Sequence, residues 1–295
     1  MIITITCNPA IDKTVYENKT VFDIGGKGIN VSKVLKSLKV DSMATGFLGK
    51  ENGKLVIDDL NKNKIENHFI EIDGSVRTNT KYINDGKLIE ENEIGPTITE
   101  DDKNRLFEYV STFENDIVII SGSVSGNSDN NIYKDLINIL KKRNNYVILD
   151  CSKQLLKNAI EAKPDIIKPN KQEICELFSI KYDEKEIIDR CKKLGIDFIC
   201  LSLAEEGAIF ICDQVYKIKP LIKEISSNVG AGDAMVAALA YGRYKALDTK
   251  QTIKLAMATS LAACQTEGTK PPIYENIMNI YKEIAINDKI RVWII

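Results

Sequence analysis

Residues 146–178 read YVILDCSKQLLKNAIEAKPDIIKPNKQEICELF, and the alternation within this stretch decides the fold. The apolar runs at 146–149 and 165–167 are short and end in charged residues, which predicts buried β-strands. Apolar residues at helical spacing follow both runs, over 154–162 and 171–178. Buried strands that alternate with helices are typical of a mostly parallel sheet covered by helices on both faces.

The same alternation continues along the rest of the chain. Further strands are predicted at 2–7, 44–48, 117–120 and 198–201, and further helices at 28–39, 53–63, 131–142 and 185–194. Residues 10–24 and 68–93 break the rhythm, because they are polar and β-rich without a helical period. We therefore expect one α/β domain over 1–295, with a small β-sheet from about 10–24 and 68–93. This small sheet is either a lid or a surface ornament.

The composition is that of a globular protein that binds neither nucleic acid nor membrane. Of the 295 residues, 44% are hydrophobic, and 40 basic against 42 acidic residues give a net charge of −2. This balance lacks the basic footprint of a nucleic-acid binder. The apolar runs are far shorter than the roughly 20 residues that span a bilayer, and the first residues resemble a strand more than a secretion signal. We expect a cytoplasmic protein.

Two residue types exclude whole classes of chemistry. The single histidine, His68, rules out a zinc site with two histidines, and a Ser-His or Cys-His nucleophile would have to use His68 itself. The seven cysteines are scattered and form no Cys-x-x-Cys motif. Buried, reduced thiols are therefore expected, which agrees with a cytoplasmic location.

The strongest functional signal is the sequence Asn-Val-Gly-Ala-Gly-Asp at 228–233, followed by an alanine-rich segment that favours a helix. Gly230 and Gly232 leave their backbone amides unobstructed at the start of that helix, where orphan donors and the helix dipole bind anions. Asp233 would lie in the first turn beside such an anion, which is unfavourable unless it has a task such as accepting a proton. The alternative is that Asp233 only complements the helix dipole.

A second glycine-rich segment, Gly-Gly-Lys-Gly-Ile-Asn at 25–30, opens the helix predicted at 28–39. Its glycines allow a ligand to approach closely, and Lys27 adds a charge that suits a phosphate. The segment is not a Walker A loop, because Lys27 is followed by glycine instead of serine or threonine. Taken alone, it is a weak signal.

Three further charged residues are candidates because of where they fall. Asp12 follows the first strand at the carboxyl edge, where open α/β sheets bind ligands, although a capping role is the alternative. Glu173 begins the helix after the strand at 165–167 and could equally complement the helix dipole. Arg77 lies in the predicted small sheet, where it is by default a solvated charge. The argument for function is that these features meet at one edge of one sheet.

Taken in order, these segments resemble the ribokinase-like PfkB carbohydrate kinase family, most closely its branch of 1-phosphofructokinases and tagatose-6-phosphate kinases. The resemblance covers nearly the whole chain, and the matching segments are 8–12, 25–31, 46–49, 77–79, 121–123, 167–170, Gly207 and 229–233. It implies a three-layer α/β/α sandwich with a mostly parallel central sheet and a small β-sheet lid. A homodimer through that lid is also implied, and it remains open against a monomer.

The resemblance also implies roles for individual residues. Gly230, Ala231 and Gly232 would form the hole for the transferring phosphoryl group, and Asp233 would be the catalytic base. The substrate-binding positions would be Asp12, Gly25, Gly26, Lys27, Asn30, Arg77 and Ser123. The nucleotide-binding positions would be Lys168, Asn170, Glu173, Ser202, Gly207 and Ala258. ATP and Mg²⁺ are the implied cofactors, with the ion held through ATP and water near Glu173.

The expected activity is ATP-dependent phosphorylation of a ketohexose phosphate to the bisphosphate. Fructose 1-phosphate is the first choice of substrate and tagatose 6-phosphate the second. Lys27 and Arg77 favour a phosphorylated acceptor over a free sugar or nucleoside, whose kinase is the rival within the enzyme class. The rival outside that class is a sugar-phosphate-binding protein that keeps the fold without turnover.

Overall fold

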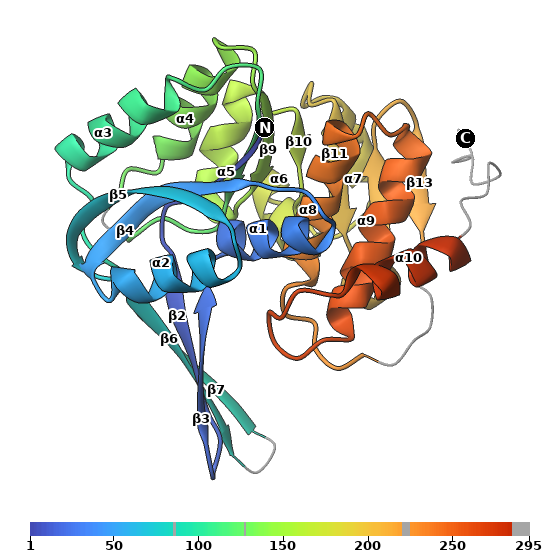
Figure 1. Cartoon of the computed structure of the whole chain (residues 1–295). Helices are drawn as coiled ribbons and strands as arrows, with labels where there is room; N and C mark the ends of the chain where they lie inside the picture. Colours follow the sequence, from blue (N-terminus) through green and yellow to red (C-terminus); the bar gives the residue numbers. More distant parts are fainter. Residues whose placement is uncertain (85–86, 127, 220–224, 285–295) are drawn as a thin grey trace.

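The computed structural model describes residues 1–84, 87–126, 128–219 and 225–284, and these residues form two β-sheets (Figure 1). The large sheet runs, in spatial order, through β13 (Val215–Ile218), β12 (Ala208–Ile211), β11 (Phe198–Ser202), β10 (Ile166–Ile167), β9 (Tyr146–Asp150), β8 (Ile117–Ser121), β1 (Ile2–Thr6), β4 (Met43–Glu51) and β5 (Glu66–Ser75). From β11 to β5 all neighbours are parallel, whereas β12 and β13 are antiparallel.

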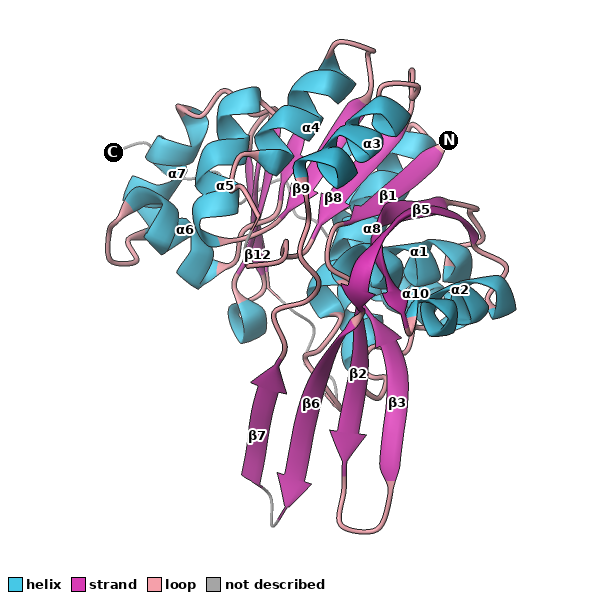
Figure 2. Cartoon of the chain, turned by 90° about the vertical axis from the view of Figure 1, so that its left-hand side faces the viewer, coloured by secondary structure: helices cyan, strands magenta, loops and turns pink. Residues whose placement is uncertain are grey.

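Helices cover both faces of the large sheet. One face carries α3 (Glu100–Val110), α4 (Ile132–Lys141), α5 (Lys153–Ala159), α6 (Lys171–Phe178) and α7 (Glu184–Lys192). The opposite face carries α1 (Lys27–Ser37), α2 (Gly53–Lys62), α8 (Ala231–Tyr244), α9 (Thr249–Cys264) and α10 (Tyr274–Glu283), as Figures 1 and 2 show. The expected three-layer α/β/α arrangement is confirmed.

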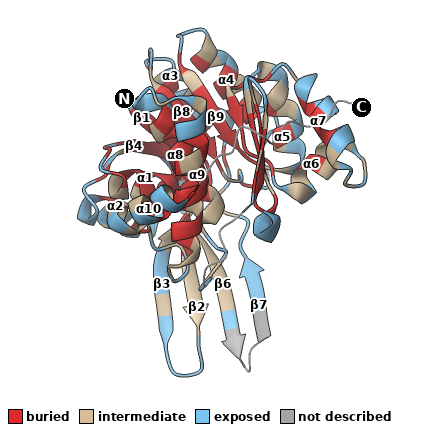
Figure 3. Ribbon diagram, turned by 90° about the vertical axis from the view of Figure 1, so that its right-hand side faces the viewer, coloured by how far each residue is buried: buried red, intermediate tan, exposed pale blue. Residues whose placement is uncertain are grey.

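The alternation of the strand side chains explains the two cores. Ile3 and Ile5 of β1 are buried in the core under α4, whereas Ile2 is buried with α1 and α8 on the other face. Because successive side chains of a strand point to opposite faces, an all-apolar strand must be covered on both sides. Figure 3 shows the resulting pattern, in which buried residues gather in the large sheet and in the helix faces against it.

The small sheet contains β3 (Thr20–Gly25), β2 (Ala10–Val15), β6 (Arg77–Asn84) and β7 (Lys87–Asn92), in that order. It projects from the carboxyl edge of the large sheet (Figure 2). The expected range 68–93 began too early, because β5 pairs with β4 in the large sheet. Ile70 and Ile72 of β5 are buried in the core beside α3, and this apolar face holds the segment there.

The structure also answers the question of membrane helices for the residues it describes. Over these residues, no helix combines the length and the apolar character that crossing a bilayer would require.

Candidate active site

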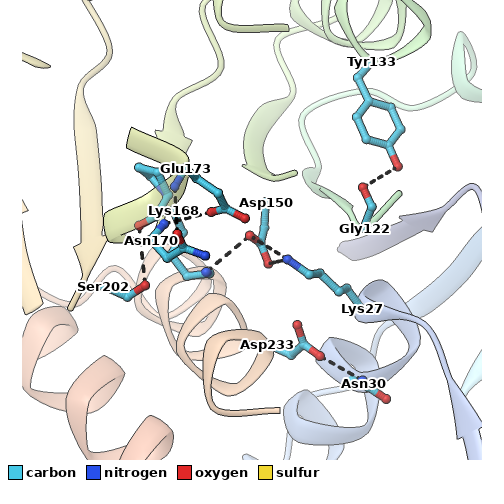
Figure 4. Close-up of polar contacts among 11 residues, drawn as sticks. Lys27, Asn30, Gly122, Tyr133, Asp150, Lys168, Asn170, Glu173, Ser202 and Asp233 are labelled. Carbon is cyan, nitrogen blue, oxygen red and sulfur yellow. Dashed lines mark hydrogen bonds and ion pairs between the residues drawn. The ribbon is translucent and has the colours of Figure 1, made fainter. Parts of the chain in front are cut away.

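The candidate site lies where the carboxyl ends of β9 and β10 meet the first turns of α1 and α8 (Figure 4). Lys27 is the first residue of α1, Asp233 lies in the first turn of α8, and Asp150 is the last residue of β9. Parallel strands bring their carboxyl ends to one edge, which is why residues far apart in sequence converge there.

Asp233 is a buried carboxylate, with only 7% of the residue exposed. Asn30 Nδ2 donates a hydrogen bond of 2.8 Å to its Oδ2. Burial, reinforced by the charge of Asp150, raises the pKa of Asp233 to about 6, and Lys27 and Asn30 oppose the rise. A buried carboxylate that titrates just below neutral pH suits a general base.

The start of α8 has the form of an anion site. Gly230 precedes the helix with a left-handed backbone, φ 81°, and no side chain caps this helix end. The first amides of a helix lack intrahelical acceptors and point toward whatever docks there. A Cβ on Gly232 would lie 3.2 Å from Lys168 Nζ, so glycine lets this lysine approach the helix end.

Asp150 joins two lysines, and the sequence did not single it out. Its Oδ2 lies 3.2 Å from Lys27 Nζ, and its Oδ1 lies 3.3 Å from Lys168 Nζ. Burial acts to raise the pKa of Asp150, but the two ammonium groups outweigh it and lower the pKa below the usual value. The carboxylate is therefore ionised. Its place at the end of a buried strand was the available signal.

Asp12 and Asn79 lie on neighbouring strands at the base of the small sheet. Asn79 Nδ2 donates a hydrogen bond of 2.9 Å to Asp12 Oδ1, while burial raises the pKa of Asp12. A Cβ on Gly25 would lie 2.1 Å from Asp12 Oδ2, so any larger residue at position 25 would displace this carboxylate. Gly26 begins the approach to α1 with φ 118°, which also favours glycine.

Several buried polar atoms around this region have no partner among the described residues. They are Asn30 Oδ1, Asn79 Oδ1 and the Nε of Arg77. Buried polar groups in folded proteins nearly always have partners, so these atoms fit a ligand that is rich in hydroxyl groups. Asn79 belongs to the quoted 77–79 segment, but we had not predicted it as a site residue.

Ser123 lies in the loop after β8, next to Gly122. A Cβ on Gly122 would lie 3.6 Å from Lys27 Cβ, so this loop runs alongside the start of α1. Ser123 is exposed, and its carbonyl accepts a hydrogen bond from the Tyr133 hydroxyl at 3.4 Å. The tyrosine hydroxyl thus anchors the backbone of this loop.

A cavity of about 730 Å³ opens beside the start of α8. It is lined by the turns after β10 and β11, the start of α8 and one face of α9. Five predicted residues are among the lining: Asn170, Ser202, Gly207, Ala231 and Gly232. A large cleft with apolar walls and a few polar groups is typical of a site for a small molecule or cofactor.

Ala258 does not reach this cavity, contrary to the sequence expectation. Ala258 belongs to α9, and its side chain is fully buried in the core. Met257, Ser260 and Leu261 line the cavity instead. The helical period explains the difference, because these three residues share a face of α9 that Ala258 does not share.

Glu173 and Asn170 form a capping box at the start of α6. Asn170 N donates to Glu173 Oε2, and Glu173 N donates to Asn170 Oδ1, both at 2.8 Å. Burial raises the pKa of Glu173. The hydrogen bond from Asn170 acts to lower this pKa, and the charge of Asp150 acts to raise it further. Glu173 thus lies in the first turn of α6, where the sequence left a helix-dipole role open, and its carboxylate also lies near Asp150.

The carboxylates at this edge limit what metal the site could hold. Among the described residues, no group of three or more histidine, cysteine, aspartate and glutamate side chains could hold a metal ion. Asp150 and Glu173 are near enough to influence one another. One or two carboxylates, completed by water and phosphate oxygens, are the usual ligands of Mg²⁺ in nucleotide sites, so these residues fit that ion.

Comparisons with known proteins show the family of this chain. The model of the pfkB family carbohydrate kinases matches residues 1–276. A 1-phosphofructokinase of Bacillus subtilis is 34% identical over 284 residues, which cover 90% of this chain and 93% of that enzyme. A tagatose-6-phosphate kinase of Staphylococcus epidermidis is 30% identical over 310 residues, which cover 97% of this chain and 99% of that enzyme.

The fold is likewise that of a solved kinase. Phosphofructokinase-2 from Escherichia coli, in complex with substrates and products, is 23% identical and matches with a TM-score of 0.88 over 96% of this chain and 98% of its own. The same enzyme has also been solved in a tetrameric, inhibited form. At this identity the structural match speaks for the fold alone, whereas the family model and the two sequence relatives span most of the chain. The protein therefore belongs to the PfkB family of carbohydrate kinases.

Proposed function

We propose that this kinase transfers the γ-phosphoryl group of ATP to a hydroxyl group of a ketohexose phosphate. Fructose 1-phosphate, giving fructose 1,6-bisphosphate, is the first choice, and tagatose 6-phosphate is the second. The observation that carries the proposal is Asp233, a buried carboxylate at the bare start of α8 with a pKa of about 6. Its neighbour Gly232 lines the large cavity, and Asn30, a proposed sugar-binding residue, donates a hydrogen bond to Asp233.

Asp233 would act as the general base. The acceptor hydroxyl gives its proton to an Asp233 carboxylate oxygen, and its oxygen attacks the γ-phosphorus. The bond between that phosphorus and the bridging oxygen breaks, so that ADP leaves. The amides of Gly230, Ala231 and Gly232, together with Lys168, would neutralise the charge that spreads over the transferring group.

Mg²⁺ is the second proposed cofactor. Asp150 and Glu173 would hold it, directly or through water, beside the phosphates of ATP. When bound, the ion supplies positive charge to the phosphate oxygens and so makes the leaving group better.

The acceptor's own phosphate is proposed to bind Lys27, Arg77 and the hydroxyl of Ser123. The Nε of Arg77 is buried without a protein partner among the described residues, which supports a role in ligand binding. Asp12, Asn30 and the backbone of Gly25 and Gly26 would bind the sugar hydroxyls. The names of the two sequence relatives, which both designate kinases of phosphorylated ketohexoses, support the same class of acceptor.

The small sheet would close over the acceptor as a lid and form a homodimer contact. Its strand register places Tyr82 opposite Ile89, and Phe22 lies on the same face two pairs further along. Phe22 is 62% and Ile89 60% exposed, so this face carries apolar surface that a second copy would cover. Sedimentation of the wild type and of Phe22→Glu tests the dimer. A cytoplasmic location is part of the same proposal.

A coupled assay that reports ADP tests the activity. We expect turnover with fructose 1-phosphate or tagatose 6-phosphate, and much weaker turnover with free fructose or a nucleoside. Calorimetric binding of the sugar phosphates without any ADP release over hours would instead favour a binding protein without turnover. Equal turnover of phosphorylated and free sugars would argue against the roles of Lys27 and Arg77.

A further inference from the structure

One buried carboxylate holds two lysines that come from opposite sides of the site. Asp150 has no exposed side-chain surface, and Lys27 and Lys168 reach it at 3.2 and 3.3 Å (Figure 4). Lys27 begins α1, beside the proposed sugar pocket. Lys168 follows β10 and lies close to Gly232, which lines the proposed nucleotide cavity.

The two lysines differ in their freedom to move. The Lys168 side chain is only 5% exposed, so it is enclosed by protein and has no other place to go. The Lys27 side chain is 40% exposed, so it can rotate toward the cleft without disturbing the core. Of the two ion pairs of Asp150, the one with Lys27 can therefore be broken without disturbing the core.

The charges around Asp150 determine the outcome of such a rotation. Two further carboxylates, Asp233 and Glu173, lie within electrostatic reach of Asp150. Lys27 and Lys168 are the cations that offset them. A buried charge is costly without compensation. If Lys27 turns away, one ammonium group faces three carboxylates, and Asp150 is left with an unpaired oxygen that attracts another cation.

On the basis of the function proposed above, we propose that Lys27 is an exchangeable counter-ion of Asp150 that competes with a divalent cation. While the sugar pocket is empty, the ammonium group occupies Asp150 and weakens metal binding there. A sugar phosphate draws Lys27 toward its own phosphate, and Asp150 then becomes available to the ion. Lys27 would in this way couple occupation of the sugar pocket to metal binding on the nucleotide side.

Coupling of this kind is reciprocal. If the sugar phosphate raises the affinity for the ion, then the ion raises the affinity for the sugar phosphate by the same factor. The arrangement would keep the metal loosely bound until the acceptor is present.

The first experiment uses Mn²⁺ alone, without nucleotide or sugar, and measures free Mn²⁺ by electron paramagnetic resonance. Lys27→Met should bind Mn²⁺ at least about tenfold more tightly than the wild type, because the competing cation is gone. Lys27→Arg keeps the charge and should bind as weakly as the wild type. Lys54→Met is the matched control, because Lys54 is an exposed lysine on α2 that pairs only with Asp58 among its described contacts.

A second variant identifies the carboxylate. Adding Asp150→Asn to Lys27→Met should remove the gain in Mn²⁺ affinity, and a melting curve shows whether the double variant folds. The proposal is overturned if Lys27→Met and Lys54→Met bind Mn²⁺ equally, or if the gain survives in a folded double variant. If the double variant does not fold, the Mn²⁺ affinities of Lys27→Met, Lys27→Arg and Lys54→Met decide whether the proposal stands.

The second experiment tests the coupling in the wild type. Mn²⁺ is titrated with and without a sugar phosphate that calorimetry shows to bind, after correction for Mn²⁺ bound by the sugar phosphate itself. The wild type should gain affinity and Lys27→Met should gain none; an equal gain in both overturns the coupling. A protein with turnover but no Lys27 effect refutes only this exchange, whereas a Lys27 effect without turnover refutes only the proposed function.

Discussion

Asn30 donates a hydrogen bond of 2.8 Å from its side-chain nitrogen to Oδ2 of Asp233, between residues that are 203 positions apart in the sequence. The bond joins the first turn of α1 to the first turn of α8, and it fixes the orientation of the proposed base. It also stabilises the ionised carboxylate, which burial disfavours. Orientation and acidity of Asp233 therefore depend on the same contact.

The pH dependence of the reaction should report this carboxylate. A base must be ionised to accept a proton, so kcat/KM should fall about tenfold per pH unit below the pKa of Asp233, about 6. In Asn30→Ala the bond that favours the ionised form is lost, so the acid limb should move to higher pH. Initial rates from pH 5 to 8 with both proteins measure this. An unmoved limb would exclude Asp233 as the titrating group.

Removal of the base should lower turnover but leave nucleotide binding intact. Asp233→Asn keeps the shape of the side chain and should reduce kcat by about 10²–10⁴-fold. Because Asp233 is not among the residues that line the nucleotide cavity, the calorimetric affinity for ADP should stay within about twofold. Unchanged ATP turnover in this variant would overturn the assignment.

The same substitution should make the fold more stable at neutral pH. The folded-state pKa of Asp233 is raised to about 6, so the folded protein binds this proton more strongly than the unfolded chain does. Stability is therefore lost as pH rises from about 4 to about 6. At pH 8 Asp233→Asn should gain about 1–3 kcal/mol in the free energy of unfolding, whereas at pH 4 the gain should disappear. Denaturant unfolding at both pH values measures the difference.

A largely enclosed lysine between α1 and α2 should control the sugar-binding residues indirectly. Lys33 Nζ lies 3.0 Å from the Ile24 carbonyl and 2.8 Å from Asp59, so it ties the end of β3 to α2. Lys33→Met should loosen the adjacent glycines and raise KM for the sugar phosphate about three- to tenfold, with KM for ATP unchanged. Lys36→Met, on the same helix but paired with the exposed Asp41, is the control. Equal effects of both variants would contradict a positioning role.

One substitution in α9 should weaken ATP binding without changing the binding of the sugar phosphate. Ser260 lines the cavity, and Ser260→Phe would place a large ring in its space. KM for ATP should rise at least about tenfold, and the calorimetric affinity for the sugar phosphate should not change. If KM for the sugar phosphate rose instead, the assignment of the cavity to the nucleotide would be wrong.

The sequence predicted several elements whose apolar pattern is one-sided. Residues 132–141 form α4 with a single buried face, and the predicted helix differs from it by one residue at each end. In contrast, α3, α9 and α10 were not predicted, although α3 and α10 each bury one side only. The buried residues of α9 lie on several sides, because α8 and α10 both pack against it, and this removes the period that marks a surface helix.

The candidate site could be predicted where the backbone itself is specialised. The glycines around Lys27 and Asp233 mark turns that other residues fit poorly, so they stand out in a single sequence. Asp150 was missed because it follows an ordinary apolar strand, and only the folded sheet brings Lys27 and Lys168 to it. Ala258 was misplaced because one residue along a helix turns a side chain by about 100°.

The place of the small sheet in the sequence has a consequence for how the chain is made. All strands of the small sheet lie within residues 10–92, whereas the described lining of the proposed nucleotide cavity begins only at Asn170. A ribosome makes the chain from its N-terminus onward. The strands proposed to cover the acceptor therefore leave the ribosome well before the residues proposed to receive the donor have been translated.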